Sequence, residues 1–468
     1  MNIMQTESLS IKNVSVIMAG LMLCLFLSAL DNAIVATAMP RIIDDLKGMT
    51  YYSLPFTTYL LFSTVAIPVA GKLSDVFGRK RIVLWGIVSF LISSALCALS
   101  VDMLMLIVAR GLQGACGGVI ASSAFIITAE LFPVKERAKY IGILASMHGL
   151  ASLLGPVMGG VITEYVSWHW IFLVNIPIGM VAIWLLNKYL PVLKHASQTN
   201  KLDVRGILVF LASILPFLFC MVEGGRLLPW TSPLLISLLI VSVFLMICFI
   251  RLERISVSPM LPAGLLKNSI FRKSAFIGAM GYVALFGLIL YVPYLLQVIL
   301  KKDAAFSGVM MLPMTLSMVV GGMLGGALIS RYQHYRRSGI VNLSIAIVGL
   351  LLLFVFGQGI SMLQMTVGLL LTGIGIGMNF PLVNIAPQSV ISVTQMGILV
   401  SSIEFFQVMG GVTATSLFGK LLGTSMSLIL LLCIGALAAG LVVSCLLDDK
   451  KIKEGFARQH SEVHTIKE

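Results

Sequence analysis

The stretch Gly71-Lys72-Leu73-Ser74-Asp75-Val76-Phe77-Gly78-Arg79-Lys80-Arg81 decides the fold of this chain. It is a short basic segment between two apolar runs, near residues 52–72 and 82–101. Each run has about 20 residues, the length that a helix needs to cross a bilayer. Gly71 and Gly78 stand where two helix ends approach and the chain turns. Because positive loops are retained in the cytoplasm, the segment is predicted to be a cytoplasmic loop between two membrane helices.

The composition excludes most soluble classes of protein. Of the 468 residues, 58% are hydrophobic and only 11% are charged, and the mean hydropathy is +1.02. Soluble domains carry about 25% charged residues. The net charge of +13 lies in short loops, which is the pattern of a membrane protein, so we expect a lipid bilayer and no nucleic acid as partner. The seven cysteines all fall in apolar runs, and no disulfide is expected.

Fourteen apolar runs are long enough to span a membrane, and they predict an all-α membrane protein. The first is not read as a cleaved signal, since it is too long and carries Asp31. The runs lie near 14–37, 52–72, 82–101, 104–125, 138–161, 168–187, 204–222, 232–250, 273–297, 306–330, 339–357, 361–383, 397–419 and 425–447.

The Lys and Arg residues test this count. With an even number of spans and the basic loop inside, both termini are cytoplasmic. Most of the 32 Lys and Arg residues then fall in cytoplasmic segments, as the positive-inside rule requires. A missed span would invert every later segment. The exceptions in outer segments are Arg41, Lys47, Arg226, Lys301, Lys302 and Lys420, and Arg110 lies inside a span.

A degraded repeat divides the chain into halves. Gly326 to Tyr332, followed by Arg336 and Arg337, echoes Gly71 to Phe77 followed by Lys80 and Arg81, with Ser330 in place of Asp75. Two six-helix bundles with two extra central helices are therefore predicted. The segments are a cytoplasmic tail at 1–13, the N-terminal bundle at 14–190, a linker with the two additional helices at 191–270, the C-terminal bundle at 271–447 and a cytoplasmic tail at 448–468.

Asp31 and Arg110 are charges placed in hydrocarbon, where each costs at least about 2.5–3.5 kcal/mol. Both lie about six residues from the outer end of their spans, or roughly 9 Å deep. We therefore expect an ion pair that faces a cavity. If the distance between the two groups changes with conformation, the proton affinity of the carboxylate changes too, which suits proton coupling. A static structural ion pair is the alternative.

Glu404 is a second carboxylate within a span, about seven residues from the inner end. It is interpreted as a second proton site or a cation-binding acid, or as an acid that pairs with a loop cation. His148 is a candidate proton relay, although a hydrogen-bonded packing role explains a lone His equally simply. Polar and aromatic residues in spans are candidate pocket residues or packing residues. They are Asn32, Tyr59, Gln113, Tyr291, Tyr294, Gln297, Asn379, Phe405, Phe406 and Gln407.

Glycines mark a predicted close helix contact. The fifth span holds Gly149 and Gly155-Pro156-Val157-Met158-Gly159-Gly160, and the tenth holds Gly321-Gly322 and Gly325-Gly326 after Pro313. Proline kinks a helix and glycine lets a neighbour approach closely. We expect these two faces to meet across the halves and to bend during opening, or else to be ordinary helix packing.

These motifs together resemble the drug:proton antiporter branch of the major facilitator superfamily, with fourteen transmembrane helices. The similarity covers roughly residues 14 to 447. It rests on the Gly71 to Arg81 loop, Leu30-Asp31 through Met39-Pro40, Arg110-Gly111-Leu112-Gln113-Gly114 and Gly155 to Gly160. It also includes Trp168-His169-Trp170 through Asn175-Ile176-Pro177-Ile178-Gly179. His169 and Gln407 stand where the branch commonly has Arg, which leaves the choice of cargo open.

The resemblance implies roles for single residues. Asp31 and Arg110, with Glu404 as a further candidate, would take part in proton coupling. Asp75, Arg79, Gly71 and Gly78 would form the inner gate, and Gly155, Pro156 and Gly159 would seal the halves.

The expected function is proton-coupled export of amphipathic, often cationic drugs across the cell membrane, by alternating access and as a monomer. A proton-coupled transporter of an endogenous solute such as a lipid, siderophore or metabolite has the same signatures. No nucleotide-binding loop, metal-ligand spacing or Ser/His/Asp set is present. An enzyme, a receptor and an ATP-driven pump are therefore not indicated, and neither a cofactor nor a metal is expected.

Overall fold

The computed structural model describes residues 11–47, 51, 54–132, 134–191, 203–224, 228–256, 259, 263–302, 304–356, 361–390, 396–421 and 426–454. Regular structure in these ranges is helical, apart from one isolated bridge between Gly224 and Leu228. In lipid, a helix satisfies every backbone hydrogen bond within one segment, which explains why each apolar run is helical. The predicted tail at 1–13 lies mostly outside the described residues, as does 455–468.

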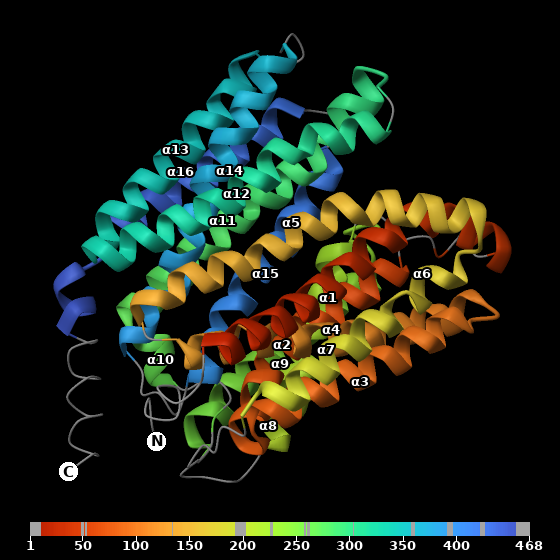
Figure 1. The fold of residues 1–468 in the computed structure, drawn as a ribbon, viewed down its shortest axis with the longest axis horizontal. Helices are drawn as coiled ribbons and strands as arrows, with labels where there is room; N and C mark the ends of the chain where they lie inside the picture. Colours follow the sequence, from red (N-terminus) through yellow and green to blue (C-terminus); the bar gives the residue numbers. More distant parts are fainter. Residues whose placement is uncertain are drawn as a thin grey trace. The chain divides into compact units, whose positions relative to one another are not determined.

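The helices follow the predicted runs (Figure 1). The N-terminal ones are α1 (Ile11–Leu46), α2 (Leu54–Phe77), α3 (Arg79–Ala98), α4 (Met103–Leu131), α5 (Val134–Tyr165), α6 (His169–Leu173) and α7 (Asn175–Tyr189). The inserted pair is α8 (Val204–Glu223) and α9 (Pro233–Ile255). The C-terminal elements are α10 (Ala263–Lys267), α11 (Ser269–Tyr294), η3 (Leu295–Ile299), α12 (Ala304–Tyr332), α13 (Tyr335–Phe356), α14 (Met362–Ile385), η5 (Ala386–Val390), α15 (Met396–Leu421) and α16 (Met426–Cys445).

Thirteen stretches among the described residues are long and apolar enough to cross a membrane. An all-helical, multi-pass membrane architecture is thus confirmed. The remaining long helix, α5, has 32 residues, and several of its side chains lie outside the description. The count of fourteen crossings therefore stays a prediction.

The chain divides into two compact units. Unit 1 comprises residues 1–131, 150–219 and 237–260, and unit 2 comprises 132–149, 220–236 and 261–468. In unit 1, α2 packs on α4, α3 on α4 and α7 on α1. In unit 2, α12 and α13 pack on α14, α15 on α11 and α16 on α11 and α13. The boundary within α5 falls after Gly149.

The α2–α3 turn is tighter than the sequence predicted. Phe77 ends α2 and Arg79 begins α3, so that Gly78 alone connects them, with φ +93°. Glycine adopts this left-handed conformation without strain. In the repeat, Gln333 follows α12 at the matching position, and its φ of +51° is also positive. The two halves therefore share a positive φ after the corresponding helix, although the residue differs.

The inserted pair α8–α9 is tied to α2 within unit 1. The Ser242 hydroxyl donates to the Ser213 carbonyl at 2.7 Å, and Lys72 Nζ of α2 donates to the Pro259 carbonyl at 3.3 Å. At the start of α8, Asp203 accepts from the Ser256 hydroxyl. That hydrogen bond is the main cause that lowers the pKa of Asp203.

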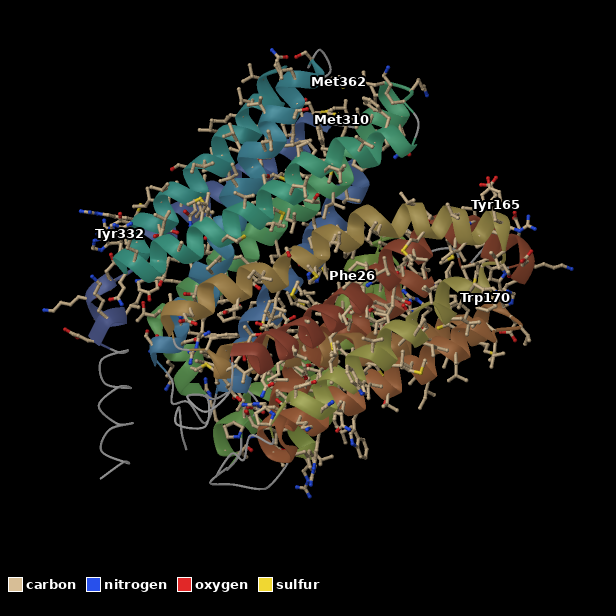
Figure 2. All side chains as sticks on the ribbon, in the orientation of Figure 1. Phe26, Tyr165, Trp170, Met310, Tyr332 and Met362 are labelled. Atoms are coloured by element: carbon tan, nitrogen blue, oxygen red, sulfur yellow. The ribbon has the colours of Figure 1, made fainter. Side chains whose placement is uncertain are left out.

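Exposed aromatic side chains gather at one end of unit 1. Tyr165, at the end of α5, and Trp170, in α6, lie there together (Figure 2) and are 77% and 55% exposed. Tyrosine and tryptophan prefer the membrane–water interface. This end therefore fits the predicted outer interface, where α5 and α6 meet.

Candidate functional site

Polar side chains from α3, α4 and α7 of unit 1 surround one buried carboxylate, Asp31 of α1. Arg110 of α4 forms an ion pair with its Oδ2 atom. The sequence predicted this pair from the equal depth of the two residues, and the structure confirms it. The expected exposure to a cavity is not found, because both side chains are fully buried.

Two amides complete the surroundings of Asp31. Gln113 Nε2 and Asn175 Nδ2 donate to Asp31 Oδ1 at 2.8 and 2.7 Å. Each amide nitrogen also donates to the Ser94 hydroxyl oxygen, at 2.8 and 2.7 Å. We call Asp31, Ser94, Arg110, Gln113 and Asn175 the Asp31 cluster. Both oxygens of the Asp31 carboxylate therefore have donors from other helices.

The guanidinium of Arg110 is held on its other sides as well. It donates to Gln113 Oε1 at 2.7 Å and to Asn32 Oδ1 at 3.3 Å, and it lies 4.3 Å from the centre of the Tyr59 ring. Gly114 permits this approach of α2 to α4, since a Cβ atom there would lie 2.3 Å from the Tyr59 carbonyl oxygen. The candidates Asn32, Tyr59 and Gln113 thus belong to the surroundings of the ion pair.

A helix break positions Asn175. Helix α6 ends at Leu173 and α7 begins at Asn175. Pro177 has no N–H to offer the Leu173 carbonyl, so a continuous helix would lose this bond. Asn175 therefore stands at the first position of α7, fully buried beside Asp31. Sequence reasoning quoted this segment as a family signature but missed the role of its asparagine.

A second polar group lies in unit 2, where α11, α14 and α15 meet. Glu404 and Gln407 share one face of α15, and Gln407 lies against Gly278 of α11. Asn379 of α14 lies against Gly281 of α11. Tyr282 lies within reach of the Glu404 charge, and its ring is 6.5 Å from that of Phe380.

The other predicted contact residues are spread along the helices. Tyr291 is buried and lies nine residues beyond Tyr282, about 13 Å along α11. Tyr294 is half-buried, and Gln297 is exposed on η3. Phe405 is buried with its ring 5.6 Å from that of Phe406. His148 is exposed on α5. The structure therefore does not bring these residues to one site.

Charged groups at the α2–α3 turn form a third group. Arg79 makes an ion pair with Asp75 and donates to Glu130 Oε1 from Nε at 2.9 Å and from Nη2 at 2.6 Å. It also donates to the Ser74 hydroxyl at 2.6 Å. We call these four residues the inner charge cluster. Glu130 was missed from sequence, although an acid that ends an apolar run just before a basic loop is a visible signal.

The predicted pairing of glycine faces is wrong in part. A Cβ atom on Gly155 would meet Ala33, and one on Gly159 would meet Thr37 and Ile34, all in α1. Gly321 and Gly325 instead lie against Ile374 and Met378 of α14. The physical reason is that each run of glycines packs against a neighbouring helix of its own unit, α1 for the glycines of α5 and α14 for those of α12.

Other glycines of α5 do contact α12. A Cβ atom on Gly142 would lie 2.9 Å from the Gly322 backbone, and one on Gly149 would lie 3.2 Å from Thr315. Both contacts fall within unit 2. The close approach of α5 to α12 thus uses the predicted Gly149 together with Gly142, which was not predicted, and it does not use Gly155 or Gly159.

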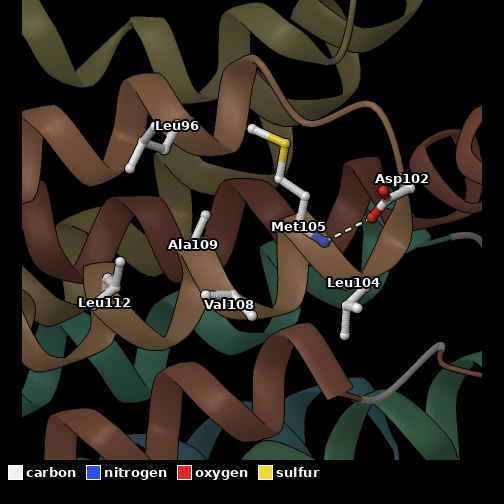
Figure 3. Close-up of a pocket in the computed structure, with 7 residues that line it drawn as sticks. All are labelled: Leu96, Asp102, Leu104, Met105, Val108, Ala109 and Leu112. Carbon is white, nitrogen blue, oxygen red and sulfur yellow. Dashed lines mark hydrogen bonds between the residues drawn. The ribbon is translucent and has the colours of Figure 1, made fainter.

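A groove between the ends of α3 and α4 is a poor candidate for cargo (Figure 3). Its apolar side chains, such as Leu104 and Val108, are largely exposed, as expected of a surface that faces lipid. Its one acid, Asp102, accepts from the Met105 backbone N–H at 2.7 Å and so caps α4. The groove therefore belongs to the lipid-facing surface.

A comparison with known families decides what this architecture is. The Major Facilitator Superfamily profile matches residues 21–415. The chain belongs to this superfamily. It is therefore a multi-pass membrane transporter and not an enzyme.

Named members of the superfamily are similar over most of the chain. The multidrug transporter protein MdtP of Bacillus subtilis is 33% identical over 87% of this chain and 75% of its own length. Multidrug resistance protein 3 of the same organism is 31% identical over 89% of this chain and 81% of its own length. The crystal structure of the human organic anion transporter MFSD10 superposes with a TM-score of 0.68 at 15% identity, over 92% of this chain and 99% of that one. At that identity the superposition supports the fold alone.

Proposed function

We propose that this protein exports amphipathic, often cationic drugs across the cell membrane in exchange for protons. The names of the Bacillus subtilis relatives support drug efflux, because they are similar over most of both chains. Both termini would be cytoplasmic, as the distribution of Lys and Arg indicates.

The observation that carries proton coupling is the Asp31–Arg110 ion pair. It is a fully buried acid and base, placed on two different helices of one unit. A movement of α1 relative to α4 would separate the charges, and an uncompensated carboxylate in low dielectric takes up a proton. Restoring the pair would release that proton again. Alternating the two states with cargo binding gives antiport.

The inner charge cluster would serve as the gate of this cycle. Arg79 has its guanidinium buried between two acids and a hydroxyl. Breaking a buried pair by removing one partner is costly, so the cluster would hold α2, α3 and α4 together in one state. The proposed roles of Gly155, Pro156 and Gly159 rest on the tendency of proline to kink a helix and on the fit of the two glycines to α1.

Purified protein in liposomes with a trapped pH dye tests the proposal. Addition of ethidium or norfloxacin should cause proton movement with the wild type and none with Asp31→Asn. The matched control is Asp102→Asn, because asparagine also caps a helix and Asp102 is exposed just before α4, about 12 Å along the helix axis from Arg110. It should transport normally.

Two results would count against the proposal. Proton flux that survives in Asp31→Asn would move coupling to another group. No flux with any drug would favour an endogenous solute such as a lipid, siderophore or metabolite as the cargo.

A further inference from the structure

Four buried polar side chains on α11, α14 and α15 make no hydrogen bond or ion pair with any described residue. They are Ser274, Asn379, Glu404 and Gln407, and each leaves a fully buried polar atom without a partner. Glu404 is 8% exposed and the other three are still more buried. Buried polar groups in folded proteins are nearly always paired, so four on neighbouring helices indicate a site for something else.

The contrast with Asp31 is direct. Asp31 has a guanidinium and two amides around its carboxylate, whereas no described cation lies against Glu404. An ion buried without a partner is strongly disfavoured. Glu404 therefore requires either a proton or a positive charge brought by a ligand.

The neighbours of Glu404 distinguish these two possibilities. A proton would neutralise the acid, but it would leave Ser274, Asn379 and Gln407 still unpaired. A ligand that brings a positive charge together with polar atoms would supply partners to all four groups at once.

The same face of α11 combines close contacts to α14 and α15 with aromatic surface. Gly278 and Gly281 carry no side chain where Gln407 and Asn379 approach, and Tyr282 follows directly. The ring of Tyr282 lies 6.1 Å from Phe286 and 6.5 Å from Phe380, both at small interplanar angles. Aromatic faces attract organic cations, so acid and rings suit the same molecule.

We propose that Glu404, Asn379 and Gln407, beside the Tyr282–Phe380 stack, bind the cationic aromatic end of an exported molecule. This deepens the proposed efflux function and rests on it for the direction of transport. Glu404 supplies the counter-charge, the two amides contact polar atoms of the ligand, and Tyr282 lies against its ring.

Equilibrium binding to the purified full-length protein, without a pH gradient, tests the site. The probe is tetraphenylphosphonium, a permanent aromatic cation that carries no exchangeable proton. Glu404→Gln should weaken its binding roughly 10- to 100-fold, the loss expected for one interaction with a charged group. Glu404→Asp keeps the charge and should bind within a few fold of the wild type, which also shows that the site tolerates substitution.

A control separates this site from the coupling site. Asp31→Asn should lose drug-dependent proton flux but keep a tetraphenylphosphonium affinity that still depends on Glu404, so that adding Glu404→Gln should weaken binding by a similar factor in either background. Failure of antiport therefore shows in the liposome assay, and failure of the cation site shows in the binding assay.

Three results would overturn the inference. Unchanged binding in Glu404→Gln would leave the acid as a proton site only. Equal losses in Glu404→Gln and Glu404→Asp would show that charge does not determine binding. A loss in Asp31→Asn alone would place the cation at the other acid.

Discussion

Asn175→Leu removes one of the three donors to the Asp31 carboxylate while keeping the side chain close in size. Asn175 Nδ2 lies 2.7 Å from Asp31 Oδ1, and Gln113 and Arg110 remain as donors. The substitution leaves the buried carboxylate with one donor fewer. The folded protein should therefore lose stability, and drug-dependent proton flux should fall because the ion pair is held less firmly.

The size of the loss follows from the geometry. A hydrogen bond to a charged group contributes about 1.5–3 kcal/mol. Because Gln113 still bridges Asp31 and Ser94, we expect the free energy of unfolding to fall by about 1.5 kcal/mol, the lower end of this range.

Two measurements apply to the wild type and to Asn175→Leu, namely thermal unfolding of the purified protein and drug-dependent proton flux in liposomes. The other charged or titratable groups around Asp31 are Arg110, Tyr59 and Cys97, and the substitution leaves all three in place. A role for Asn175 in packing alone would lower the stability without lowering the flux of the folded protein.

The matched control is Asn342→Leu. Asn342 is also fully buried, donates from Nδ2 to the Met378 carbonyl at 2.9 Å and lies in unit 2. It has no carboxylate as a partner, so its substitution should cost less stability, about 0.5–1.5 kcal/mol, and should leave the proton flux unchanged. Equal losses of proton flux in both variants, or unchanged stability in Asn175→Leu, would refute the reasoning.

Three further predictions concern stability, each measured by thermal unfolding of the purified protein. Gly159→Ala should lower the free energy of unfolding by about 1–3 kcal/mol, since its Cβ would lie 2.7 Å from a backbone oxygen of α1. Its matched control is Gly160→Ala, whose Cβ would meet nothing within 4 Å, so this substitution should be neutral. Glu130→Gln should destabilise the fold by about 1–3 kcal/mol, because it removes the charge of one of the two acids that pair with Arg79. Unchanged stability would mean that Asp75 alone is enough to hold Arg79. Ser256→Ala should raise the pKa of Asp203 toward its ordinary value. The wild type should therefore be more stable than this variant at pH 7, and the difference in stability should be lost progressively as the pH falls below about 4. An advantage that persists in acid would contradict the assignment.

Local features of the chain were accurate guides to the fold. The apolar runs predicted the helices, since backbone hydrogen bonding in lipid permits little else. Gly78 was predicted to turn the chain, and it does so alone. Equal depth in the membrane was enough to pair Asp31 with Arg110, because depth follows from counting residues along each span.

The errors concern which helix faces which. The Gly155 and Gly159 face was assigned to the tenth span, but it fits α1. Sequence shows that a helix has a small-residue face and does not name the neighbour that uses it. Glu130 was overlooked for a related reason, since its partner Arg79 lies 51 positions earlier.

The sequence by itself therefore determined the membrane class, the helices and the depth of each buried charge, because these depend on residues close together in the chain. Tertiary structure decided which buried charges are satisfied. Asp31 gains Asn175 from 144 positions away, while Glu404 is left without a described partner. Only packing brings such distant groups within hydrogen-bonding distance, and it alone distinguishes an acid that already has partners from one that has none among the described residues.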